Sequence, residues 1–258
     1  MTAFPGLFVS HGAPTLATGD HPARAFLSAL GARLGRPEAI VVVTAHWTTR
    51  QPSLSAGAHP ATIHDFRGFP PDLYTLLYPA PGAPGLARLA AGRLRTAGLE
   101  ADIDESRGLD HGTWVPLLLM YPAADIPVVQ VSVQPGLGPA HHLRLGRALA
   151  PLRRENILVM GSGAATHNLA EYGDAASPEP SWARDFAEWL AENVEAGSTD
   201  ALLDYRARAP AAARNHPTDE HLLPLFAALG AATPGTPGRR IHASTDHGVL
   251  RLDAYRWD

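Results

Sequence analysis

Three runs of mostly branched apolar residues limit the fold of this chain more than any other feature. They are Ala39–Ala45, Ile126–Val133 and Ile157–Gly161. A strand with one face in water alternates apolar and polar residues, whereas a continuous apolar run is typical of a strand buried on both faces, as in a parallel sheet covered by helices. The shorter run Gly6–Ser10 predicts a further strand.

Helical spacing of apolar residues separates these strands, most clearly in Ser181–Val194. Further helices are expected over residues 26–34, 86–97, 114–121, 141–152 and 222–229, and a loop with a short helix over 60–84. Residues 240–244 and 249–255 are expected to form a closing antiparallel pair. The alternation predicts an α/β fold, a three-layer αβα sandwich around a mostly parallel central sheet. Because no repeat or linker divides residues 1–258, we expect a single domain.

The composition excludes several classes of chemistry. The chain has no cysteine, and all 21 of its basic residues are arginine, so it offers no thiolate nucleophile, cysteine zinc site or Schiff-base lysine. A net charge of −4 gives no basic surface for nucleic acid. No run approaches the roughly 20 apolar residues of a membrane span, and no basic leader precedes the first apolar run. We therefore expect a cytoplasmic protein with neither a nucleic acid nor a membrane as partner.

Several of the 13 histidines lie just after predicted strands. His11 follows the first strand, His46 follows the second, and His167 comes a few residues after Ile157–Gly161. The carboxyl ends of parallel strands meet at one edge of a sheet, so these side chains and His111 are expected to converge there. Such a cluster of imidazoles suits zinc, iron or a similar metal. A structural role is preferred for the remaining candidates, which are His21, His59, His141, His142, His216, His242 and His247.

Other motifs are weaker. His221 precedes a helix that Pro224 allows to begin there, so it is either an oriented entry-turn residue or a surface histidine beside two acids.

The segment 161–163 resembles a phosphate loop but lacks the third glycine, and neither Ser10 nor Ser162 lies in a nucleophile elbow. The His64-Asp65 pair belongs either to a substrate lid or to a turn.

Taken together, seven ordered segments resemble the class III extradiol ring-cleaving dioxygenases, in the 4,5-DOPA dioxygenase-like branch. Each segment alone is not specific, but the set follows the family's order over nearly the whole chain. The segments span residues 10–14, 41–47, 62–70, 78–82, 109–114, 161–163 with 166–169, and 217–225.

The resemblance implies a single catalytic αβα domain over residues 1–258 with a non-haem metal centre. It implies that His11 and His46 are metal ligands and that His221 is the third. His167 is either a further ligand or the acid–base residue, because related enzymes use the matching histidine in that role. His111 is implied to be a catalytic residue facing the substrate or oxygen.

The resemblance also implies that His64 and Asp65 belong to a substrate-binding loop. The wider family uses two histidines and one carboxylate, but here His221 stands where the carboxylate is expected, with Glu220 beside it. If Glu220 is the ligand, the site is the usual iron triad. If His221 is, the site is all nitrogen and more favourable to zinc.

The expected function is therefore metal-dependent extradiol opening of a catechol-type, DOPA-like ring by O₂. Fe(II) is the expected working metal, and zinc is possible in the purified protein. The alternatives are a zinc-dependent hydrolase using metal-bound hydroxide and a non-catalytic binding module. The sequence does not identify the catechol or the oligomeric state.

Overall fold

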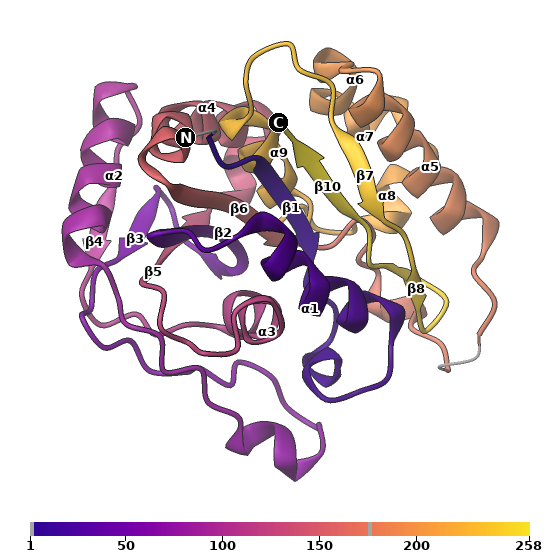
Figure 1. Cartoon of the computed structure of the whole chain (residues 1–258). Helices are drawn as coiled ribbons and strands as arrows, with labels where there is room; N and C mark the ends of the chain where they lie inside the picture. The colour runs from indigo at the N-terminus through magenta and orange to yellow at the C-terminus, as the bar shows by residue number, and fades with distance from the viewer. Residues whose placement is uncertain (1–2, 175–176) are drawn as a thin grey trace.

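The central sheet has strands in the order β4-β3-β5-β2-β6-β1-β10-β7 (Figure 1). The structure is a computed structural model that describes residues 3–174 and 177–258. A small second sheet pairs β8 with β9. The strands are β1 (Gly6–Ser10), β2 (Ala39–Thr48), β3 (Ser53–Ser55), β4 (Asp102–Asp104), β5 (Val128–Val133), β6 (Ile157–Gly163), β7 (Arg239–His242), β8 (Thr245–Asp246), β9 (Leu250–Arg251) and β10 (Ala254–Trp257).

Helices lie between and around these strands. The α-helices are α1 (Pro22–Leu34), α2 (Pro84–Thr96), α3 (His111–Met120), α4 (Gly138–Leu149), α5 (Ser181–Glu195), α6 (Thr199–Leu203), α7 (Tyr205–Arg208), α8 (Ala212–Asn215) and α9 (Leu223–Ala231). The short 3-10 helices are η1 (Pro14–Ala17), η2 (Pro71–Thr75), η3 (Pro135–Leu137), η4 (Ala150–Glu155) and η5 (Leu169–Glu171). No helix in the described ranges is long and apolar enough to span a membrane.

The middle of the sheet is parallel. β6 pairs in parallel with both β1 and β2, and β2 pairs in parallel with β5. Antiparallel pairs occur where β10 joins β1 and β7, and where β3 joins β5. The carboxyl ends of β1, β2 and β6 therefore lie side by side, as the predicted mostly parallel sheet requires.

Successive side chains of a strand point to opposite faces of a sheet. In the parallel strands both sets are buried, because helices pack on both faces. In β2, Ile40 and Val42 pack into a core with α1 and α3, whereas Val41 and Val43 pack into a core with α2, α4, α5 and α9. In Figure 1, α1 and α3 lie below the sheet, on the side opposite α4. The predicted three-layer αβα sandwich is confirmed.

Some element boundaries differ from the expectation. β2 continues through His46 to Thr48, and α3 begins at His111 because Asp110 caps it by accepting a hydrogen bond from the Thr113 N–H. The predicted C-terminal pair forms two separate pairs: β7 with β10 in the main sheet, and β8 with β9 outside it. The predicted helix in the 60–84 loop is the 3-10 helix η2.

Candidate metal centre and active site

The site begins where three neighbouring strands end. His11 directly follows β1, and its N–H donates to the carbonyl oxygen of Gly163 at the end of β6 (3.0 Å). His46 lies near the end of β2 on the other side of β6. Because β6 lies between β1 and β2, the two histidines face one another across its end.

The Nε2 atoms of three imidazoles converge. Those of His46 and His11 are 2.9 Å apart, and those of His221 and His46 are 3.3 Å apart. One ring nitrogen from each of the three lies within 4.8 Å of the others. His11 and His221 are only 2% and 5% exposed. His11 and His46 thus meet at one edge of the sheet as the strand pattern predicts, and His221, which only the resemblance implied, joins them there.

The outer ring nitrogens of these histidines face oxygen atoms. The Ser162 hydroxyl donates its proton to the Gly112 carbonyl oxygen, so it can only accept from the His11 Nδ1–H, 3.1 Å away. Glu220 Oε1 lies 3.0 Å from His221 Nδ1, and an Asp65 oxygen lies 3.4 Å from His46 Nδ1. Protons held on Nδ1 leave the Nε2 lone pairs directed at a common point, as in histidine metal sites.

Burial keeps these imidazoles neutral. It lowers the pKa of His11 and His221 well below the ordinary value, and the neighbouring imidazoles lower both further. Burial also lowers the pKa of His46 to about 3. Neutral imidazole is the form that binds metal. The donor set therefore fits a metal ion, with His11, His46 and His221 as the residues able to hold it.

The backbone at the start of α9 determines where His221 lies. Its carbonyl oxygen accepts from the Ala164 N–H at the end of β6 (2.9 Å). A Cβ atom on Gly163 would lie 2.1 Å from that carbonyl oxygen, and one on Gly161 would lie 2.1 Å from the Pro224 carbonyl oxygen. The two glycines of β6 therefore allow the α9 entry turn to approach the sheet.

Of the two residues considered for the third position, His221 faces His11 and His46. Glu220 lies behind it and accepts from the Thr218 hydroxyl as well as facing His221 Nδ1. Glu220 also lies within 4.8 Å of ligand atoms of His167 and His221. The geometry thus gives Glu220 the position of an orienting carboxylate.

His167 and His111 complete the histidine cluster, by which we mean His11, His46, His111, His167 and His221. The His167 ring stacks on that of His221 at 3.4 Å, and burial lowers its pKa to about 4. The rings of His111 and His46 are 3.9 Å apart. Both His167 and His111 line the cavity described below, so each can exchange a proton with a molecule bound there.

Asp65 connects the 62–76 loop to the histidine cluster. One of its oxygens accepts from both the backbone N–H and the Nδ1 of His111, each at 2.9 Å. Although burial acts to raise it, these hydrogen bonds bring the pKa of Asp65 down to about 2. His64 points elsewhere: its Nε2 is 3.0 Å from the Leu76 carbonyl oxygen, and it does not line the cavity.

A cavity of about 500 Å³ opens over the imidazoles. This volume lies in the range of small-molecule sites. Apart from the histidine cluster and Asp65, its lining is mostly apolar: Gly12, Ala13, Pro14, Phe66, Arg67, Phe69, Ala164, Leu169, Tyr172, Leu250 and Leu252. Such a cavity suits a flat aromatic ring with one polar edge at the imidazoles.

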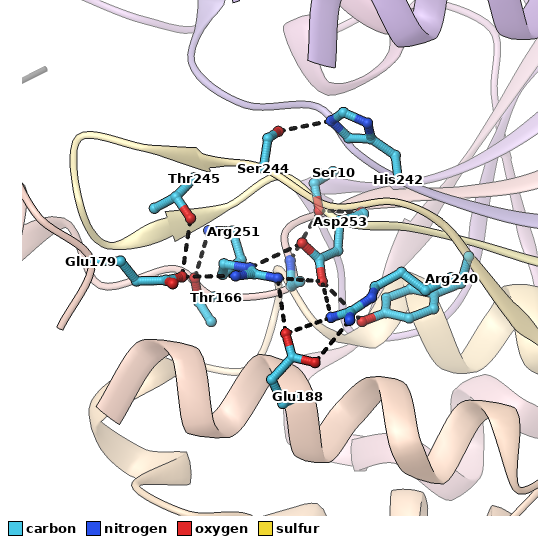
Figure 2. Close-up of polar contacts among 12 residues, drawn as sticks. Ser10, Thr166, Glu179, Glu188, Arg240, His242, Ser244, Thr245, Arg251 and Asp253 are labelled. Carbon is cyan, nitrogen blue, oxygen red and sulfur yellow. Dashed lines mark hydrogen bonds and ion pairs between the residues drawn. The ribbon is translucent and has the colours of Figure 1, made fainter. Parts of the chain in front are cut away.

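The segment 249–253, which we call the strap, was predicted as part of a strand pair but not as part of the site. Its side chains alternate: Leu250 and Leu252 line the cavity, whereas Arg251 and Asp253 point away into an ion-pair network (Figure 2). The alternation is visible in the sequence, but nothing there indicates that it lies beside the histidines.

The backbone of the strap holds the loops that carry His11 and His167. The Ser10 hydroxyl donates to the Asp253 carbonyl oxygen (2.8 Å) and accepts from the Ala165 N–H (3.1 Å). The Thr166 hydroxyl donates to the Val249 carbonyl oxygen (2.7 Å) and accepts from the Arg251 N–H (2.8 Å). These contacts fix the ends of β1 and β6 to the same segment.

The sequence matches the family described as the catalytic LigB subunit of aromatic ring-opening dioxygenase over residues 6–246. The chain belongs to this family. It is 43% identical to the 4,5-DOPA dioxygenase extradiol of Beta vulgaris over 97% of this chain and 95% of that protein. It is also 43% identical to the protein of that name from Escherichia coli (strain K12), over 89% of this chain and 86% of that one.

A solved structure has the same fold. The crystal structure of an uncharacterized protein from Escherichia coli K12 matches with a TM-score of 0.82 and 35% identity, covering 99% of this chain and 100% of that one. The predicted resemblance and the predicted enzyme class, an extradiol ring-opening dioxygenase that depends on a metal, are confirmed. The zinc-hydrolase alternative is not favoured.

Proposed function

We propose that this LigB-family enzyme opens a catechol-type, DOPA-like ring beside its diol with O₂, at an Fe(II) ion held by His11, His46 and His221. The convergence of three neutral Nε2 atoms, two from the ends of β1 and β2 and one from the entry turn of α9, carries this proposal. Three nitrogens leave open positions for substrate and oxygen. Zinc also fits an all-nitrogen set, so protein purified without added iron can carry it.

The ion, when bound, supplies the electron chemistry that connects O₂ to the ring. The residues of the chain position the ring and move protons. His167 lies at the cavity wall beside His221, and we assign it to take a proton from the diol as general base. His167 or His111 then returns a proton to the oxygen of the opened product.

Asp65 is assigned a positioning role beside this chemistry. Because Asp65 accepts the Nδ1–H of His111, the Nε2 of His111 is directed to the cavity. The apolar walls around Phe66, Leu250 and Leu252 hold the ring and exclude water. Since groups from both ends of residues 1–258 contribute, we propose that the chain acts as one catalytic domain.

An aerobic screen of substituted catechols with Fe(II)-reconstituted protein tests the function. We expect a yellow semialdehyde in air and no product without O₂. Product formation under anaerobic conditions would instead favour hydrolysis. His167→Ala is expected to abolish turnover while retaining metal, with the exposed His59→Ala as the matched control. Full activity of His167→Ala would remove His167 from the mechanism.

A further inference from the structure

Only two charged side chains other than histidine line the cavity among the described residues, Asp65 and Arg67. The carboxylate of Asp65 already has partners within the protein, because it accepts two hydrogen bonds from His111 and lies 3.4 Å from His46 Nδ1. Of the 21 arginines of the chain, Arg67 alone is in this wall. Among the described residues, Arg67 is therefore the one arginine that could pair with a negatively charged group of a ligand in the cavity.

The backbone around Arg67 is held in place while its side chain is exposed. On either side, Phe66 and Phe69 pack against each other with ring centroids 5.3 Å apart, and Phe66 packs on Tyr74 at 5.1 Å. Within residues 3–174 and 177–258, no carboxylate lies within the 4.0 Å of an ion pair with Arg67. The backbone of Arg67 is thus held in place, and its exposed guanidinium is available to a ligand.

The imidazoles and Arg67 lie at different depths in the cavity. The imidazoles of His11 and His221 are almost fully buried, whereas Arg67 is exposed. A ring with its diol at the imidazoles would therefore direct an opposite substituent toward the exposed end. The Tyr172 hydroxyl, whose residue also lines the cavity, is already 2.7 Å from His247 Nδ1.

We propose that Arg67 determines substrate specificity by binding a carboxylate on the ring substituent. A guanidinium offers paired N–H donors that match the two oxygens of a carboxylate. The enzyme therefore prefers catechols with an anionic side chain over neutral ones of the same size. This inference rests on the proposed function for the direction in which the ring lies.

The test compares two ligands that differ in charge and by one methyl group, 3-(3,4-dihydroxyphenyl)propionate and its methyl ester. Binding to metal-loaded protein is measured by calorimetry without O₂, and KM and kcat are measured in air. Arg67→Gln is expected to weaken binding of the acid roughly 2- to 5-fold, as for an exposed ion pair, and to leave the ester and kcat unchanged. Arg67→Lys should recover part of the loss.

Arg88→Gln is the matched control, since Arg88 is an exposed arginine of α2 that does not line the cavity. In the wild type, added salt should weaken the acid and not the ester. Equal loss for acid and ester in Arg67→Gln, or no loss beyond that of Arg88→Gln, would overturn the proposal. Selective binding of the acid through Arg67 without ring opening in air would refute the proposed function and support Arg67.

Discussion

The histidine cluster and the ion-pair network of Glu179, Glu188, Arg240, Arg251 and Asp253 both bury polar groups near the same end of the sheet. In the network each charge faces an opposite charge: Arg251 lies 3.0 Å from Asp253 and 2.9 Å from Glu179, and Arg240 lies 2.8 Å from Glu188 (Figure 2). In the cluster, like groups face one another.

This difference separates stability from function. Buried charges that are paired within the protein are satisfied by the fold itself. Buried Nε2 lone pairs that face each other are satisfied only by something added, such as a metal ion. The strap joins the two regions, because Arg251 and Asp253 are in the network while its backbone holds the loops of His11 and His167.

The sharpest test of the comparison is His46→Ala. We expect it to abolish metal retention and ring opening, because it removes one of three converging nitrogens. Without metal, its free energy of unfolding should change by only about 1 kcal/mol, as for an ordinary substitution. Metal analysis, turnover and urea unfolding measure these effects. His59→Ala, an exposed histidine, should resemble the wild type.

Arg251→Met should do the opposite. It leaves Asp253, which is fully buried, without its main partner, so the free energy of unfolding should fall by about 3–5 kcal/mol. Arg239→Met is the matched control, since that arginine forms an exposed ion pair with Asp258 and should cost less than about 1 kcal/mol. Equal unfolding midpoints in urea for the two variants would contradict the distinction.

Acid should affect the neutral region before the charged one. His216 is fully buried behind the cluster, 2.9 Å from the Ala165 carbonyl oxygen, and burial lowers its pKa from 6.5 to about 3. The unfolded chain therefore takes up this proton first, and stability falls as pH decreases from 6.5 toward 3, by about 1.4 kcal/mol per pH unit for one proton.

Glu188 also loses its stabilisation as pH falls, but in a lower pH range than His216. The hydrogen bond from Arg240 lowers its pKa below 4.5, so its stabilisation is complete above that pH and is lost below it. In metal-free protein, His216→Gln should reduce the slope of unfolding free energy against pH between 7 and 5, by a difference that approaches about one proton at pH 5. Glu188→Gln should leave that slope unchanged. A slope unaltered by His216→Gln would refute the assignment.

The sequence allows the fold and half of the site to be predicted for a simple reason. Continuous apolar runs mark strands buried on both faces, and parallel strands share one edge for their carboxyl ends. His11 and His46 follow from that topology alone. His221 needed the family resemblance, because its approach depends on contacts between α9 and β6 that no local pattern reports.

Tertiary contacts decide the rest. The three-residue strands β3 and β4 have no periodic signal, and β4 is polar. His64 and Asp65 are adjacent in sequence, yet only Asp65 reaches the cluster, because His64 is bound to the Leu76 carbonyl within its own loop. The orienting role of Ser162 depends on its hydroxyl donating to the carbonyl oxygen of Gly112, 50 residues away in the chain.

The close approach at Gly161 and Gly163 has a consequence for how this enzyme can vary. A single added methyl group at either position would push the α9 entry turn outward and carry His221 with it, although no imidazole is altered. Libraries that randomise only the visible pocket would miss this constraint, while random mutagenesis would find inactive clones whose metal-binding residues are all intact. An active variant must therefore keep the space between β6 and the α9 entry turn as well as the metal-binding side chains.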